Sequence, residues 1–173
     1  RTLPRERTQL KTVAVREFNF QYAGDPQELS DALSRHGWQQ AQPANWSWII
    51  LSMNPEPTES TLPPLKRDFF GHADSLLLHR LGGDPMSQET LRIWDSGVRL
   101  KPGGQAVYLG LVAEELLVQR MVLFSYWSAR PAAHERLQQL AIEVGPSEAG
   151  VFQVQQAEDR MLLIRNPQVP RGS

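Results

Sequence analysis

The sequence predicts an α+β domain in which a mostly antiparallel sheet is covered by two or three helices. Three observations lead to this fold class. Apolar residues recur with a period of two in several short segments, as is typical of half-buried strands. Two other segments carry apolar residues with the 3.6-residue period of a helix. The chain has 173 residues, which is enough for one domain with a buried core.

The two ends of the chain differ in composition from its middle. Residues 1–12 are basic, with four Lys or Arg residues and a single Glu, and we interpret them as a linker. A basic stretch before a domain is typical of a juxtamembrane segment, although a solvated tail has the same composition. We expect a single domain over residues 13–166. Residues 167–173 are a tail, and its last five residues are similar to a thrombin-cleavage linker from an expression vector.

The first elements are a strand and a helix. Phe18, Phe20 and Tyr22 alternate with polar residues, which predicts a strand that begins near residue 13. Asp25 and Pro26 then form a typical helix start, and Gly37 is a natural stop. The apolar face of this helix is expected to be Leu29, Ala32, Leu33 and His36.

The middle of the chain is less regular. Residues 45–53 form an apolar segment that fits either a buried helix or a strand. Residues 54–64 contain four prolines among polar residues, which predicts a long loop within the domain.

The second half has the pattern of an antiparallel sheet followed by a helix. Strands are predicted at residues 76–81, 90–95, 107–113, 116–126, 151–154 and 161–164, with turns at 82–85 and 101–104. We expect the strands on either side of Glu114 and Glu115 to form a long hairpin that bends at this acidic pair. Pro131 is expected to open a helix that ends before Gly145. Its predicted inner face is Ala133, Leu137, Leu140, Ala141 and Val144.

Composition and motifs exclude several classes of function. Lys and Arg total 18 against 19 Asp and Glu, which argues against a nucleic-acid partner. The chain has no cysteine, so disulfides, thiolate metal sites and cysteine nucleophiles are excluded. It also lacks a Gly-x-Ser-x-Gly elbow, a phosphate-binding glycine loop and a His-Glu-x-x-His motif. We therefore assign no catalytic residue, no metal ligand and no cofactor.

One group of side chains is a candidate ligand site. Arg92 and Trp94 share one face of a predicted strand, with Leu91 and Ile93 on the other. Arg80 on the neighbouring strand and His72 are expected to join them, because two close arginines suit a phosphate group. The alternative is that a loop or helix covers Trp94, in which case Arg92 and Trp94 have a structural role.

A different grouping would give an enzyme. The alternative interpretation is a hydrolase. It would use three residues that are capable of acid–base chemistry and lie within eight positions of one another: His72, Asp74 and His79. A metal bound by the two histidines would favour that reading.

Several segments together resemble the LssY C-terminal domain family. They are Gly37-Trp38, Leu51-Ser52-Met53-Asn54-Pro55, Leu62-Pro63-Pro64-Leu65, Phe70-Gly71-His72, Leu91-Arg92-Ile93-Trp94 and Gln105-Ala106-Val107-Tyr108-Leu109-Gly110. The order and spacing of these segments carry the resemblance, which runs from about residue 13 to about residue 140. Some family members have paired histidines where this chain reads Phe124-Ser125-Tyr126-Trp127. A role tied to those histidines is therefore not expected here.

The resemblance implies a membrane context. Domains of this family follow DedA-like and type 2 phosphatidic acid phosphatase domains in bacterial inner-membrane proteins, and the phosphatase chemistry belongs to those parent domains. We expect a non-catalytic accessory or regulatory domain on one side of the inner membrane, with the periplasmic side favoured. Its expected partners are the parent membrane domains and a phospholipid head group or envelope component. The alternatives are the hydrolase above and a scaffold that oligomerises through an exposed sheet edge.

Overall fold

The structure is a computed structural model and describes residues 6–9, 13–41, 62, 64, 68–69, 71–84, 86–120, 124–144, 153–156 and 162–165. The first elements along the chain are β1 (Glu6–Gln9), β2 (Val13–Glu17), β3 (Phe20–Ala23), α1 (Pro26–Ser34), β4 (Gln39–Gln40), β5 (Asp68–Phe69) and β6 (His72–Ala73). The later elements are β7 (Leu76–Leu81), β8 (Ser87–Leu100), β9 (Gln105–Arg120), β10 (Phe124–Pro131), α3 (His134–Val144), β11 (Gln153–Gln156) and β12 (Leu162–Arg165).

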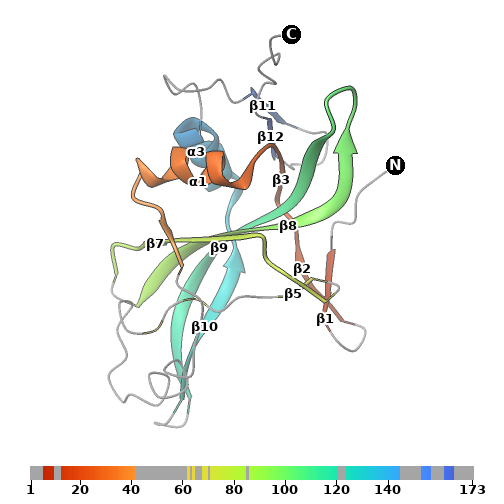
Figure 1. The fold of residues 1–173 in the computed structure, drawn as a ribbon. Helices are drawn as coiled ribbons and strands as arrows, with labels where there is room; N and C mark the ends of the chain where they lie inside the picture. Colours follow the sequence, from red (N-terminus) through yellow and green to blue (C-terminus); the bar gives the residue numbers. More distant parts are fainter. Residues whose placement is uncertain are drawn as a thin grey trace.

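One large sheet organises the molecule (Figure 1). Its strand order is β11-β12-β3-β9-β8-β7-β4, and β10 pairs with β9 beside β3. All pairings are antiparallel except that of β12 with β3, which is parallel. The predicted α+β class with a mostly antiparallel sheet is therefore confirmed. Two further strand pairs, β1 with β2 and β5 with β6, lie outside this sheet.

Strand β1 lies within the basic segment that the sequence analysis assigned to a linker. It pairs with β2, so that Gln9 is opposite Val13 and Glu6 is opposite Glu17. Four residues of the segment 1–12 are thus part of a strand pair.

The start of α1 follows the predicted signals. The Asp25 carboxylate accepts a hydrogen bond from the Gln27 backbone amide at 2.8 Å, and Pro26 occupies the first turn. Gly37 has a φ of +83°, a left-handed conformation that glycine adopts without steric cost. His36 was expected on the buried face, but α1 ends at Ser34, and His36 lies exposed in the turn that follows.

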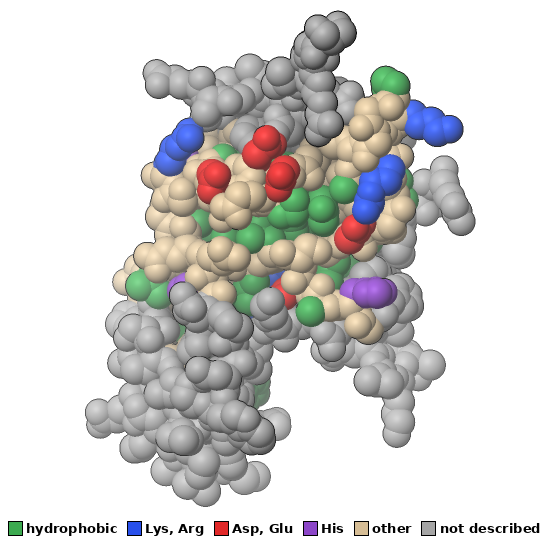
Figure 2. All heavy atoms as spheres, in the orientation of Figure 1, with side chains coloured by type: hydrophobic (Ala, Val, Ile, Leu, Met, Phe, Trp, Pro, Cys, Tyr) green, Lys and Arg blue, Asp and Glu red, His purple; other side chains and the backbone are tan. Residues whose placement is uncertain are grey.

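Helices α1 and α3 are the two helices in the described part of the chain, and both lie on one side of the sheet (Figure 1). We call this side the helix face. Their apolar stripes pack on alternate strand residues to form the main core, which consists of Phe20, Tyr22, Leu29, Ala32, Leu33, Trp38, Leu76, Leu78, Leu91, Ile93, Val112, Leu137, Leu140 and Val144. Acidic side chains gather on the outer surface over α1 (Figure 2), where Asp25, Glu28 and Asp31 are exposed.

The opposite face of the sheet is also buried. One cluster there consists of Phe18, Trp94, Leu109, Leu111 and Ala113, and the Phe18 and Trp94 rings meet edge to face with centroids 5.7 Å apart. A second cluster consists of Leu62, Leu117 and Trp127. The Trp127 indole donates to the Leu62 carbonyl oxygen at 2.7 Å. Burial on both faces explains why β9 contains a continuous run of non-polar residues from Ala106 to Ala113.

The predicted bend at Glu114 and Glu115 is wrong. Strand β9 continues through both residues to Arg120, and β10 pairs with it residue by residue from Phe124 opposite Arg120 to Pro131 opposite Ala113. Charged residues in a strand need not mark a turn when each has a suitable environment. Glu114 points to solvent, and Glu115 is buried beside an arginine described below.

The predicted start of the last helix is also displaced. Pro131 is the last residue of β10, and α3 begins at His134. Proline is tolerated at this position because β10 pairs only with β9 among the described strands, so the missing amide hydrogen breaks no second ladder. Ala133 precedes the helix and is exposed, whereas the other predicted inner-face residues are buried or half-buried.

Some predictions fall outside the described residues. They are the apolar segment 45–53, the tail 167–173 and most of the loop 54–64, of which Leu62 and Pro64 are described and buried. Within the described part, no helix is both long and apolar enough to cross a membrane.

Candidate functional site

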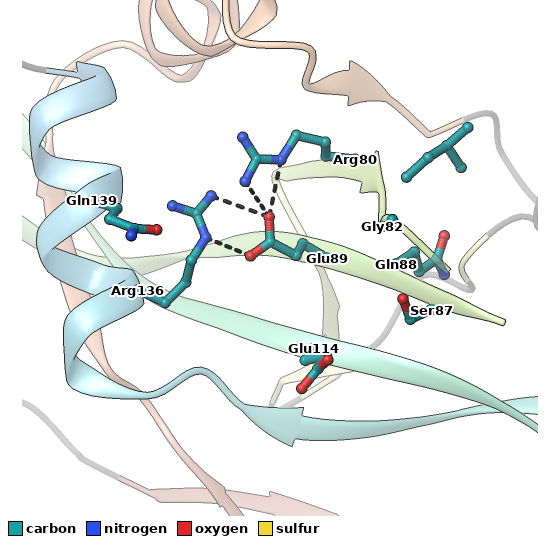
Figure 3. Close-up of a pocket in the computed structure, with 10 residues that line it drawn as sticks. Arg80, Gly82, Ser87, Gln88, Glu89, Glu114, Arg136 and Gln139 are labelled. Atoms are coloured by element: carbon teal, nitrogen blue, oxygen red, sulfur yellow. Dashed lines mark hydrogen bonds and ion pairs between the residues drawn. The ribbon is translucent and has the colours of Figure 1, made fainter. Parts of the chain in front are cut away.

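A groove of about 410 Å³ opens between α3 and the β7–β8 turn (Figure 3). Strands β7, β8 and β9 and helix α3 supply its lining residues, which are Arg80, Leu81, Gly82, Gly83, Ser87, Gln88, Glu89, Glu114, Arg136 and Gln139. The groove is predominantly polar, and it contains four charged side chains. We call it the β7–α3 groove.

Two arginines converge on Glu89 at the floor of the groove (Figure 3). Arg80 comes from β7, directly opposite Glu89 on β8, and its Nε donates to Glu89 Oε2 at 2.9 Å while Nη2 makes a second contact. Arg136 reaches down from α3, and its Nε and Nη2 both donate to the same carboxylate. This arrangement connects the helix to two strands.

Glu143 provides a second carboxylate for the same arginines. It accepts from Arg80 Nη1 at 3.1 Å and from Arg136 Nη1 at 3.2 Å. The Trp38 indole donates to Glu143 at 3.1 Å, and both guanidinium groups lie near the Trp38 ring, 5.1 and 5.9 Å from its centroid. The network therefore contains two positive and two negative side chains around one aromatic ring.

The network sets the protonation of its carboxylates. Burial alone would raise the pKa of Glu89, but hydrogen bonds from Arg136 and Arg80 outweigh burial and lower it below the usual value. The pKa of Glu143 is lowered in the same way, with Trp38 and Arg136 as the main donors. Both glutamates are thus ionised at neutral pH, and the donors of both arginines are directed at these carboxylates rather than at the open groove.

The structure places Arg92 and Trp94 away from this groove. Successive residues of β8 alternate between the faces, so Arg92 lies on the face opposite the helices while Arg80 lies on the helix face. The expected grouping of Arg80 with Arg92 is therefore wrong. Arg92 and Trp94 are 1% and 0% exposed, which is the covered arrangement expected for a structural role.

Arg92 is the centre of an interior ion-pair cluster. Its Nη1 donates to Asp74 at 3.1 Å, and its Nη2 donates to Glu115 at 3.2 Å, with all three side chains at most 1% exposed. Gln88 donates to the other oxygen of Glu115 at 3.1 Å. Buried charges require such partners because desolvation makes an unpaired charge costly. This cluster explains why Glu115 is tolerated within a buried strand.

The residues of the hydrolase alternative have three different environments. His72 is exposed on the short strand β6, and Asp74 is buried against Arg92. His79 is half-buried on β7, where burial lowers its pKa and nearby Glu115 offsets part of that effect. Among the described residues, no group of three or more His, Asp or Glu side chains is arranged to hold a metal ion.

Sequence reasoning identified Arg80 but missed its partners. A hairpin with its turn at residues 82–86 places Arg80 opposite Glu89, so the strand register contained this signal. Arg136 and Glu143 are seven residues apart and therefore share one helix face. No local pattern connects α3 with β7, because that contact depends on how the helix packs.

Comparison with known families gives one match. The model of a family described as "LssY C-terminus" matches residues 1–123, well over half of the chain. The match includes β1 and the groove residues of β7, β8 and β9, and it ends before β10 and α3. No curated protein and no solved structure is significantly similar to the chain. The chain belongs to the LssY C-terminus family.

Proposed function

We propose that this chain is a non-catalytic accessory domain of a bacterial membrane lipid phosphatase protein. It binds a lipid head group or envelope partner at the β7–α3 groove and leaves the phosphatase chemistry to the parent membrane domains. It lies on one side of the inner membrane, with the periplasmic side favoured. The match to the LssY C-terminus family supports the proposed parent context, because the resemblance to this family implies domains that follow phosphatidic acid phosphatase domains.

The observation that supports the proposal is the arrangement of charged side chains in the groove. Its two arginines bind Glu89, which also lines the groove, and Glu143, which does not. These contacts connect α3 to the sheet and form a polar floor under an open volume of about 410 Å³. A concave, largely pre-formed surface of this kind is typical of binding sites. The acid–base candidates His72, Asp74 and His79 do not line this groove.

The proposal is tested by an assay of the purified chain with phosphatidic acid and with a generic phosphate ester. We expect phosphate release no greater than that of a heat-denatured sample. His72→Ala and His79→Ala variants are measured in parallel, because a contaminating enzyme is present equally in all three samples. Release by the wild type that falls in either variant would assign the hydrolase function instead.

A further inference from the structure

The helix face carries a row of four charged residues across four strands. The register places Arg80 opposite Glu89, Glu89 opposite Glu114, and Glu114 opposite Arg130. Directly opposite residues have Cβ atoms about 4.5–5.5 Å apart and point to the same face. The row therefore reads positive, negative, negative, positive from β7 to β10.

The two pairs of residues in this row differ in their interactions. Arg80 and Glu89 are bound to each other and to α3. Glu114 and Arg130 are exposed, and neither has an ion pair or hydrogen bond within the described part of the chain. The groove thus ends in a carboxylate beside a guanidinium, and both are available to a ligand.

An apolar strip adjoins this charged end. The next helix-face residues along β9 are Leu116 and Val118, and Val118 is opposite Tyr126 on β10. Leu116 and Val118 are half-buried, and Tyr126 is 39% exposed. This part of β9 and β10 extends beyond α1 and α3 (Figure 1). Exposed apolar surface next to a polar groove is typical of a binding site.

We propose that the groove and the strip bind one zwitterionic amphiphile, with an ammonium group on Glu114, a phosphate group on Arg130 and its hydrocarbon chain along Leu116, Val118 and Tyr126. The inference rests on the proposed function and names its ligand class. A phosphoethanolamine lipid has this order of groups, with a short spacer between the two charges. Charge complementarity favours it over a purely anionic lipid, because the charged side chains of the groove, its network and the row sum to no net charge. They are Arg80, Arg130 and Arg136 with Glu89, Glu114 and Glu143.

The test is a calorimetric titration of the chain with dihexanoyl-phosphoethanolamine, kept below its critical micelle concentration. Two lipids that lack the ammonium group, dihexanoyl-phosphatidylglycerol and dihexanoyl-phosphatidic acid, are titrated in the same way. We expect the phosphoethanolamine lipid to bind about tenfold more tightly than either, and Glu114→Gln to remove that preference. Arg130→Gln is expected to weaken binding of all three lipids about equally.

Matched controls separate these effects from general charge changes. Asp95 and Arg99 are exposed charges on β8, six and ten positions along the strand from Glu89, so Asp95→Asn and Arg99→Gln are expected to leave the affinities unchanged. Leu116→Ser is expected to weaken binding of the lipids but not of free phosphoethanolamine.

Three results would overturn the proposal. Equal affinity for lipids with and without the ammonium group would refute the head-group assignment, and the proposed function would survive if binding still occurred at the groove. Absence of binding by every lipid would refute this inference and the lipid branch of the proposed function together. A dimer in light scattering that Leu116→Ser dissociates would assign the strip to a second copy of the chain.

Discussion

Two arginines of neighbouring strands show how residue environment decides role. Arg92 is 1% exposed and bound by Asp74 and Glu115 in the interior, whereas Arg80 lies at the open groove with 27% of its side chain exposed. The sequence predicts the two on adjacent strands, where they could act together. Whether the two side chains share a face depends on strand register, and Arg80 lies opposite Glu89 while Arg92 lies opposite Leu77. Arg80 and Arg92 therefore point to different faces.

The interior cluster gives a stability prediction. Arg92→Met removes the guanidinium and leaves Asp74 and Glu115 buried without this partner, so we expect the free energy of unfolding to fall by about 3–5 kcal/mol. Arg99→Met is the matched control, because the Arg99–Asp95 pair is 47% and 42% exposed, and solvent screening leaves it little effect on stability. Urea unfolding of both variants measures the difference. A similarly small decrease in the free energy of unfolding for both variants would contradict the expected role of the cluster.

The groove network gives a pH prediction. The folded-state pKa of Glu89 is lowered from its usual value of 4.5, so its ion pairs stabilise the fold fully above that pH. This contribution is lost as the pH falls through the lower, folded-state value. We expect Glu89→Gln to destabilise the chain by about 1–2 kcal/mol near neutral pH, since the pairs are partly exposed, and by less in acid. Unfolding curves that show the same difference at both pH values would contradict this.

At the scale of elements, the sequence predicted local structure better than element ends. The start of α1 follows from its capping residue and proline, and β7 has the predicted bounds, ending at the glycine turn that follows it. The length of β9 could not be predicted from the local sequence, because the adjacent Glu114 and Glu115 resemble a polar turn. Only the contact of Glu115 with Arg92, 23 positions away in the chain, explains why the strand continues.

The close packing of β3 against β9 depends on one glycine. Gly110 lies opposite Phe20, and a Cβ atom at Gly110 would lie 2.2 Å from the Phe20 ring. We expect Gly110→Ala to reduce the free energy of unfolding by about 1–3 kcal/mol through overpacking. Gly83→Ala is the control, because a Cβ at Gly83 meets no atom within 4 Å. Equal melting temperatures for the two variants would show that β3 moves to accommodate the extra carbon.

One large sheet organises the whole molecule, and its two faces differ in what they carry. The helix face carries the main core under α1 and α3 and the β7–α3 groove at its edge, and the opposite face buries the Arg92 cluster. The fold class and most elements could be predicted from periodicity and turn residues. The groove could not, since Arg136 and Glu143 reach it only when α3 packs on the sheet 47 or more positions from Glu89.

We propose that the chain binds its ligand on the helix face, at the groove and the adjoining strip. Amide chemical shifts of the labelled chain during a titration with dihexanoyl-phosphoethanolamine test this most directly. We expect shifts concentrated at Glu114, Leu116, Tyr126 and Arg130, with Arg92 and Trp94 unchanged. Shifts centred on Arg92, Asp74 and His79 instead would place the ligand on the opposite face and contradict the account.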